Sequence, residues 1–452
     1  MSKQAGCNVW LKLENMQPTQ SFKIRGIGCL CAKAFAEQGA RHFVAVGDTN
    51  AALAVAYSGR QLGVPVTVMV PASSGVQTPP IRPKLELEGA VVVECGRTLR
   101  DAYAAACAFA EKTEGALVVD SADDPAAVAG NASLASEISI QLQRREPDAI
   151  VVAVGSGGLL AGLVAGLRRC RWQRVPVIAV ETHNTNSFQR ALLRDADDAA
   201  AIAAAAATDS SIASTPTAAL PSLLPSLERG PEAECGEIRP PSRPVSEGSA
   251  HSLPLQRVTA ASAAAADHRA SEPTVATCLL AGTTCRSALE AAREHPIVPL
   301  SITEAMAVEA CRRLLDEHQL LVEVGSAAAL SVVGKGLVHQ IIPGLNHDSH
   351  VVVVVTGGAN TNFDRLEACR QRFPYPAPII AKSGHEIFMC MHDAALTPAP
   401  GPAVGAVARA AATPSLDSLS INAGSVLEAA PTQHGTINTA TSTAPAAAPP
   451  RP

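Results

Sequence analysis

The chain has few aromatic residues and no strong excess of charge of either sign. Aromatic side chains make up 3% of its 452 residues, and 36 Lys and Arg residues face 41 Asp and Glu residues, for a net charge of -5. This weak negative balance provides no electrostatic surface for nucleic acid or for an anionic membrane. Hydrophobic residues still make up 47% of the chain, enough for a large core, and the length indicates two domains with additional segments.

A membrane-spanning run, a signal peptide and paired cysteine motifs are also missing. No uninterrupted apolar run reaches the roughly 20 residues that cross a bilayer. The N-terminus has neither the basic start nor the apolar core of a secretory signal. The 12 cysteines form no C-x-x-C pair, and Cys29, Cys31 and Cys107 lie in apolar runs, which is typical of reduced, buried thiols. We therefore expect a cytoplasmic protein without a membrane or nucleic-acid partner.

Short runs rich in Val, Ile and Leu alternate with longer alanine-rich helical patterns. The runs are residues 42–46, 64–70, 90–94, 149–154, 175–181 and 351–355. Continuous apolar strands separated by helices predict parallel sheets that are covered on both faces, and hence an α/β fold. Ligands of such sheets bind beyond the carboxyl ends of the strands.

Two long stretches depart from this alternation. Residues 194–270 and 376–452 are rich in Ala, Ser, Pro and Thr and show little periodicity. Such segments cannot bury enough apolar surface to offset the entropy lost on ordering. We interpret the first as a low-complexity insertion and the second as a largely disordered C-terminal tail.

The most informative motif is Ser21-Phe22-Lys23-Ile24-Arg25-Gly26, in which a lysine begins an apolar, helix-compatible stretch. A buried lysine loses its proton readily and can then act as a nucleophile or a base. The alternative for Lys23 is an ordinary lysine of an amphipathic helix. The preceding residues 11–18, Leu-Lys-Leu-Glu-Asn-Met-Gln-Pro, favour the functional interpretation because they complete a longer motif.

A glycine-rich loop and a strand-end hydroxyl add two further candidate elements. Residues 155–159, Gly-Ser-Gly-Gly-Leu, follow one apolar run and open a helix, so their N–H groups can bind a phosphate. The Rossmann glycine spacing is not met. Thr356 ends the run 351–355 and is followed by Gly357, Gly358 and Asn360. By itself, a threonine that ends a buried strand needs no function.

In this order, the three elements resemble those of the serine/threonine dehydratases, a group of fold type II (tryptophan-synthase-β-like) pyridoxal-phosphate enzymes. The animal-type L-serine dehydratases are the most similar group, and the resemblance covers about residues 9–193 and 272–373. It implies two open, twisted, mostly parallel sheet domains with pyridoxal 5'-phosphate between them. Residues 1–25 and 121–375 would form the large cofactor-binding domain, and residues 26–120 the small domain that closes over the substrate.

The resemblance also assigns roles to individual residues. Lys23 would bind the cofactor as a Schiff base and remove the α-proton, Phe22 would lie against the ring, and Thr356 would face the pyridine nitrogen. The other residues implied to bind cofactor are Asn50, Gly155, Ser156, Gly157, Gly158 and Leu159. Ser21, Thr49 and Asn50 would bind the substrate, and Glu181 and Thr185 would border a monovalent- or divalent-cation site.

The implied activity is an L-serine or L-threonine ammonia-lyase, a homodimer that serves amino-acid catabolism and gluconeogenesis. The family's Ser-x-Gly-Asn substrate loop is here Gly47-Asp48-Thr49-Asn50. Asp48 either caps the following helix or points into the site. If Asp48 points into the site, its charge would repel a substrate carboxylate. At a separation of about 4 Å and an effective dielectric constant near 20, this repulsion would cost roughly 4 kcal/mol. Two alternatives stay open: a pyridoxal-phosphate-binding pseudoenzyme, and a serine racemase in which Thr49 supplies the second acid or base.

Overall fold

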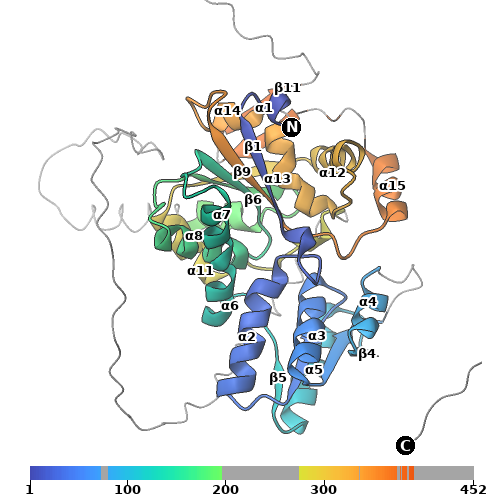
Figure 1. The fold of residues 1–452 in the computed structure, drawn as a ribbon. Coiled ribbons are helices and arrows are strands. Elements are labelled where there is room, and N and C mark those ends of the chain that lie inside the picture. Colours follow the sequence, from blue (N-terminus) through green and yellow to red (C-terminus); the bar gives the residue numbers. More distant parts are fainter. Residues whose placement is uncertain are drawn as a thin grey trace, which may run out of the picture. The chain divides into compact units, whose positions relative to one another are not determined.

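The described part of the chain contains two sheets flanked by helices (Figure 1). The computed structural model describes residues 1–72, 80–195, 274–334, 336–373, 377, 379–383 and 386–390. The predicted insertion lies outside the described residues except for residues 194 and 195, and so does the predicted tail from residue 391 onward.

The larger sheet has seven strands, and its first five neighbours are parallel. Their order is β1 (Asn8–Leu13), β9 (His350–Val355), β6 (Ala149–Ala153), β7 (Val177–Thr182), β8 (Ile297–Ile302), β10 (Ile379–Ser383) and β11 (Glu386–Cys390). β10 pairs antiparallel with both β8 and β11. These last two strands fall inside the stretch interpreted as a tail, where the sequence pattern did not indicate them.

The smaller sheet has four strands, all parallel. Their order is β4 (Val91–Glu94), β3 (Val66–Val70), β2 (His42–Val46) and β5 (Ala116–Val118). Parallel strands separated by helices make up most of both sheets, which confirms the α/β fold expected from the alternating runs.

Helices connect the strands and cover the sheets. They are α1 (Ser2–Ala5), α2 (Lys23–Glu37), α3 (Asn50–Leu62), α4 (Arg82–Leu87), α5 (Leu99–Lys112), α6 (Pro125–Asn131), α7 (Ser133–Gln141), α8 (Gly158–Arg169), α11 (Arg286–Glu294), α12 (Glu304–His318), α13 (Val324–Gly334), α14 (Leu337–Ile341) and α15 (Phe363–Arg372). Two short 3-10 turns, η1 (Glu14–Met16) and η3 (Thr277–Leu279), follow β1 and precede α11.

The central strands of each sheet are buried on both faces, whereas the edge strand β4 carries exposed residues. In the larger sheet, Val151 and Val353 pack with α12 and α13, whereas their neighbours Ile150 and Val352 pack with α7, α8 and α11. In the smaller sheet, α2, α3 and α4 share one core, and α5 covers Val44 on the other face. Successive strand residues point to opposite faces, so two buried faces require the unbroken apolar runs seen in the sequence.

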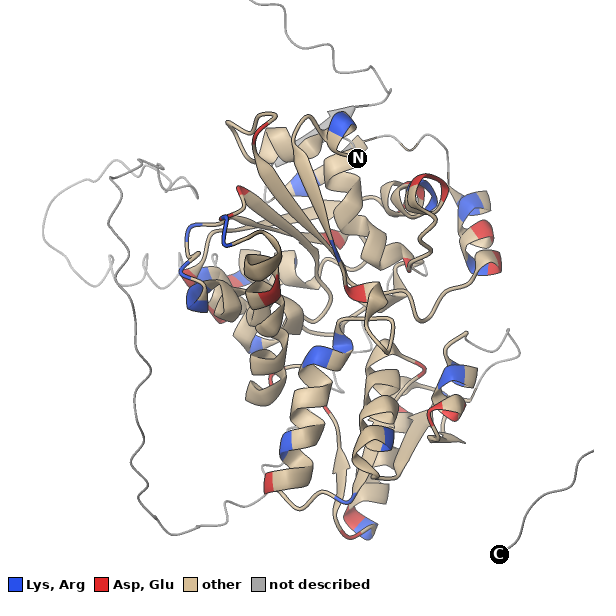
Figure 2. Cartoon of the chain, viewed as in Figure 1, with Lys and Arg blue, Asp and Glu red and all other residues tan. Residues whose placement is uncertain are grey.

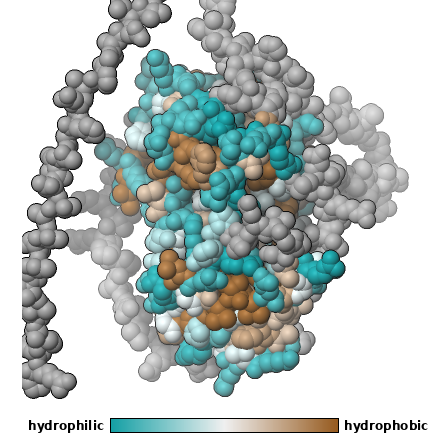
Figure 3. Space-filling view, turned by 90° about the vertical axis from the view of Figure 1, so that its right-hand side faces the viewer, coloured by the Kyte–Doolittle hydropathy of each residue, from teal (hydrophilic) through white to brown (hydrophobic). Residues whose placement is uncertain are grey.

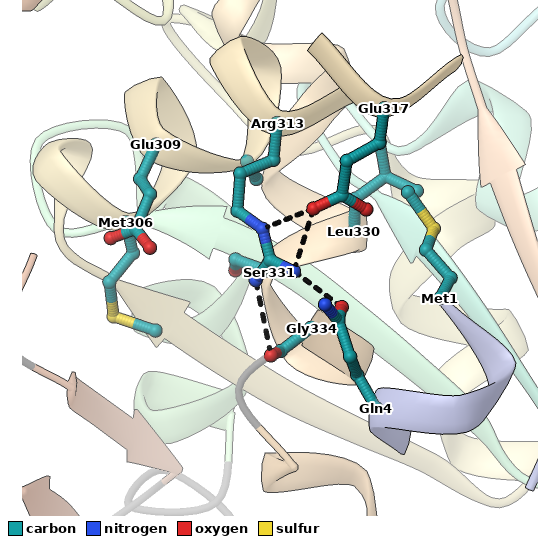
Figure 4. Close-up of a pocket in the computed structure, with 10 residues that line it drawn as sticks. Met1, Gln4, Met306, Glu309, Arg313, Glu317, Leu330, Ser331 and Gly334 are labelled. Carbon is teal, nitrogen blue, oxygen red and sulfur yellow. Dashed lines mark hydrogen bonds and ion pairs between the residues drawn. The ribbon is translucent and has the colours of Figure 1, made fainter. Parts of the chain in front are cut away.

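A side-chain hydrogen bond joins the N-terminal helix α1 to α12 (Figure 4). Arg313 of α12 donates to Glu317 at 3.0 Å, to the side chain of Gln4 and, at 3.5 Å, to the carbonyl oxygen of Gly334. The cavity beside it has a volume of about 20 Å³. Such a space holds little more than one water molecule, so this contact is structural.

The described surface carries charges of both signs on the same elements (Figure 2). Figure 3 looks onto the side that bears α4 and β4, where apolar residues gather between polar ones. Leu87, Val91 and Val93 are among the exposed large apolar side chains. Among the described helices, none has both the length and the apolarity needed to cross a membrane.

Candidate active site

Eleven residues that the sequence singled out for cofactor or substrate line one cavity of about 500 Å³. They come from four places in the fold: the start of α2, the loop between β2 and α3, the loop between β6 and α8, and the end of β9. They are Ser21, Phe22, Lys23, Thr49, Asn50, Gly155, Ser156, Gly157, Gly158, Leu159 and Thr356. The last three places follow the carboxyl ends of parallel strands, where ligands of α/β sheets bind.

Lys23 is the first residue of α2 and lines this cavity. Removal from water lowers the pKa of its amine, and the nearby Asp120, Cys285 and Cys278 oppose this effect. Its Nζ lies 5.2 Å from the centre of the Phe22 ring. A lowered pKa increases the fraction of neutral amine, the form that attacks an aldehyde or accepts a proton.

Hydrogen bonds on both sides fix the position of Lys23. Before it, the N–H of Phe22 donates to the carbonyl oxygen of Thr356 at 2.9 Å. After it, Arg25 donates to both oxygens of Glu14, at 2.6 and 2.8 Å, and to both oxygens of Glu137, at 2.7 and 2.6 Å. Glu14 is fully buried. These contacts raise the pKa of Arg25 and lower the pKa of Glu137 to about 2.

The loop 155–159 has the geometry of an anion site. Gly157 precedes α8 with a φ of 96°, a conformation that L side chains rarely adopt, and a Cβ there would lie 2.5 Å from the Cβ of Ala288. The first N–H groups of a helix have no partner within the helix and attract negative charge. The loop therefore requires glycine at position 157 and presents donors to the cavity.

The loop before α3 decides between the two roles expected for Asp48. Thr49, and not Asp48, caps α3: its hydroxyl accepts from the N–H of Ala52 at 3.1 Å. Asp48 does line the cavity, but Arg82 donates to its two carboxylate oxygens at 3.3 and 3.0 Å. The charge of Asp48 is therefore not left uncompensated beside the substrate loop.

Asn50 and Ser21 show polar atoms that have no partner among the described residues. The Nδ2 of Asn50 donates to Glu323 at 2.7 Å, whereas its Oδ1 is buried and makes no hydrogen bond. The hydroxyl of Ser21 is buried and unpaired as well. Both residues line the cavity. Unpaired buried polar atoms cost free energy, so they indicate that a polar ligand belongs there.

Several residues to which the sequence analysis assigned no role complete the wall. Glu323 also accepts from the N–H of Asn360 at 3.1 Å, and Thr356 donates to the hydroxyl of Ser326 at 2.9 Å. Cys278 hydrogen-bonds to Glu323 and Ser326, and burial raises the pKa of its thiol.

Glu181 and Thr185 lie outside this cavity. Glu181 accepts from the N–H groups of Phe188 and Gln189 at 2.9 and 2.8 Å, and burial raises its pKa to about 7. Thr185 shares a 2.9 Å hydrogen bond with Thr182. Over the described ranges, no group of three or more His, Cys, Asp or Glu side chains could hold a metal ion. A cation here stays a prediction.

The cavity fits pyridoxal phosphate. It combines a lysine of lowered pKa for the aldehyde, a helix N-terminus for the phosphate and an aromatic ring beside the lysine. The unpaired Oδ1 of Asn50 can accept a hydrogen bond from the hydroxyl group of the cofactor ring. Thr356 can serve as a neutral polar neighbour of that ring.

Comparison with known proteins agrees with this fit. The family model described as pyridoxal-phosphate dependent enzyme matches residues 1–230. The human L-serine dehydratase/L-threonine deaminase is 32% identical over 381 residues, covering 82% of this chain and 92% of the relative. The human serine dehydratase-like protein is 33% identical over 376 residues, covering 82% and 91%. The solved structure of a fungal L-serine ammonia-lyase from Rhizomucor miehei aligns with a TM-score of 0.62 and 28% identity, covering 82% and 95%.

The chain belongs to the family of pyridoxal-phosphate dependent enzymes and has their fold type II architecture. Pyridoxal phosphate is therefore its cofactor.

Proposed function

We propose that the chain is an L-serine ammonia-lyase that also accepts L-threonine, releasing ammonia with pyruvate or 2-oxobutanoate. The observation that carries the proposal is the meeting of Lys23, the loop 155–159, Asn50 and Thr356 in one cavity. The names of its relatives support the same reaction class.

When bound, pyridoxal phosphate withdraws electrons from the α-carbon of an amino acid, so that the α-proton and then the β-hydroxyl group can leave. Lys23 would hold the cofactor and, as a neutral amine in a desolvated site, accept the α-proton as general base. The aromatic ring of Phe22 would limit the movement of the cofactor's pyridine ring. The N–H groups of residues 155–159 would hold the phosphate.

Substrate recognition would rest on Ser21, Thr49 and Asn50. The unpaired hydroxyl of Ser21 can donate to a substrate carboxylate, and the first N–H groups of α3 favour an anion. Thr356 is a neutral residue, so it offers no negative charge to stabilise a proton on the pyridine nitrogen, as the carboxylate of an aspartate would. A weaker electron sink favours prompt loss of the β-hydroxyl over exchange of the amino group.

The same proposal includes the organisation and location of the protein. Residues 1–25 and 121–375 would form the cofactor domain, and residues 26–120 the closing domain, which contains all four strands of the smaller sheet. We expect a homodimer, which sedimentation velocity tests. The described cysteines are all free thiols, which supports a reducing compartment such as the cytoplasm.

The test is pyruvate release from L-serine by purified protein supplied with pyridoxal phosphate, with Lys23→Ala as control. Lysine-dependent pyruvate supports the lyase, and the cofactor absorption band must shift in the Lys23→Ala protein. Cofactor binding without pyruvate would favour the pseudoenzyme instead. Conversion of L-serine to D-serine as the main product would favour the racemase.

A further inference from the structure

The substrate loop contains an acidic residue whose charge is matched by an arginine from another element. Arg82, at the start of α4, donates through Nε and Nη2 to the carboxylate of Asp48 at 3.3 and 3.0 Å. Its Nη1 donates to Glu94 at 2.6 Å. The side chains of Asp48 and Arg82 are each only 13% exposed, whereas Glu94 is 50% exposed. Asp48 therefore depends on Arg82 far more than Glu94 does.

This pair lies beside the residues that would bind the substrate. Asp48 lines the cavity directly before Thr49 and Asn50. Asn360 donates through Nδ2 to the backbone oxygen of Asp48 at 3.3 Å, so the loop is held from two sides. The hydrogen bond to Asp48 also raises the pKa of Arg82, which keeps the guanidinium charged.

An uncompensated carboxylate at this position would repel an anionic substrate group at short range. Bidentate pairing with arginine spreads the charge and fixes the direction of the carboxylate. The guanidinium lies behind Asp48, since Arg82 is not among the cavity-lining residues. It can therefore act on the substrate only through Asp48.

We propose that Arg82 is a specificity-determining positioning residue, which neutralises Asp48 and thereby lets the cavity bind the α-carboxylate of an amino acid. This inference rests on the proposed function for the identity of the substrate, but its structural basis is independent of turnover. Arg82 would thus act together with the loop that contains Asp48, although it lies 34 residues further along the chain.

A second arginine–carboxylate pair offers a matched control. Arg60 of α3 donates to Glu88, at the end of α4, at 2.6 Å, with side-chain exposures of 48% and 18%. Neither residue lines the cavity. Arg60→Gln removes an arginine–carboxylate pair without changing the charge beside the substrate.

The experiment compares the wild type with Arg82→Gln, Asp48→Asn, the double variant and Arg60→Gln, all loaded with pyridoxal phosphate. We expect Arg82→Gln to raise the KM for L-serine at least tenfold and to change kcat by less than about threefold. Asp48→Asn and the double variant should keep a KM within about threefold of the wild type. Arg60→Gln should change neither constant.

A second measurement needs no turnover. Glycine has an α-carboxylate but no β-hydroxyl, so it can bind without undergoing the elimination. Its binding can therefore be followed by the rise in the thermal melting temperature of the protein. Arg82→Gln should lose this response and the double variant should regain it. Failure of wild-type turnover with intact glycine binding would contradict the proposed function and leave this inference standing.

Two results would overturn the inference. One is an Arg82→Gln protein that folds and binds both amino acids as the wild type does. The other is a double variant that binds them at least tenfold more weakly than Asp48→Asn does, since Arg82 would then act through something other than the charge of Asp48. The second comparison holds even if Arg82→Gln alone does not fold.

Discussion

Asn50 and Glu323 are 273 residues apart in sequence and are joined by a 2.7 Å hydrogen bond in the wall of the active-site cavity. Asn50 begins α3, beside the smaller sheet, and Glu323 directly precedes α13, which packs on the larger sheet. The carboxylate of Glu323 thereby fixes which way the amide of Asn50 faces, and leaves its Oδ1 free for the cofactor.

The first prediction follows from this contact. Glu323→Ala leaves the Asn50 amide and the Asn360 N–H without their acceptor, and each unpaired buried donor costs about 1–3 kcal/mol. We expect at least tenfold weaker binding of pyridoxal phosphate, measured by titration of the cofactor absorption band. Glu323→Gln keeps one acceptor oxygen and should lose less. Glu290→Ala, at a side chain with 54% exposure, is the control; equal affinities for the wild type and Glu323→Ala would refute the role.

The parts of the site that the sequence predicted share one property: each is marked by a short, continuous stretch of sequence. Lys23 and the loop 155–159 are recognised from a few adjacent residues, because the phosphate site is made by consecutive backbone N–H groups. Thr356 follows an apolar run that could only be a buried strand. These positions require no knowledge of long-range contacts.

Arg82 and Glu323 could not be assigned in this way. Their roles come from partners 34 and 273 residues away, and no local motif reveals such contacts. The role of Asp48 was left open for a related reason. Asp48 is a residue type that often caps helices, but in the structure Thr49 caps α3 and Asp48 pairs with the distant Arg82.

The second prediction concerns the buried ion network beside Lys23. Arg25→Ala would remove the two short hydrogen bonds to the carboxylate of Glu14, which has 0% side-chain exposure, and leave it only Gln17 at 3.3 Å and Lys12 at 3.9 Å. Removing one member of a buried pair costs about 3–5 kcal/mol. We expect urea unfolding to show a loss of this size. Arg286→Ala, which breaks a pair with 86% and 54% exposure, should change the unfolding free energy by less than about 1 kcal/mol. Similar losses in both variants would contradict the network.

The third prediction is a pH dependence of stability. Hydrogen bonds from Arg25 are the main cause that lowers the pKa of Glu137 from 4.5 to about 2. A carboxyl with a lowered pKa stabilises the fold above its unfolded pKa, and this contribution is lost as the pH falls through the folded value. The wild type should therefore lose more thermal stability than Glu137→Gln between pH 4.5 and about 2. An equal fall in melting temperature for the wild type and Glu137→Gln over this range would argue against the pairing of Glu137 with Arg25.

The fourth prediction tests the glycine loop. Gly157→Ala places a Cβ 2.5 Å from Ala288 at a φ of 96°, so the loop must move to accept it. Because the displaced N–H groups are the proposed phosphate donors, we expect at least tenfold weaker cofactor binding with the remaining fold intact. Gly39→Ala is the matched control, since Gly39 also has a positive φ, 71°, but no atom within 4 Å of its added Cβ. Circular dichroism separates loss of fold from loss of cofactor.

The last prediction concerns Lys84, which links α4 to the residues around the cofactor site. Its Nζ donates to the side chain of Gln20 at 2.8 Å and to the carbonyl oxygen of Ala359 at 2.6 Å. Lys84→Met keeps the aliphatic stem and removes both bonds, so α4 should separate more readily from these residues. We expect faster amide hydrogen exchange in α4 and a several-fold higher KM for L-serine, because closure over the substrate becomes less favourable. Lys112→Met, at an exposed residue of α5, should change neither. If amide hydrogen exchange in α4 is unchanged in Lys84→Met, these two hydrogen bonds do not hold α4 against the residues around the cofactor site.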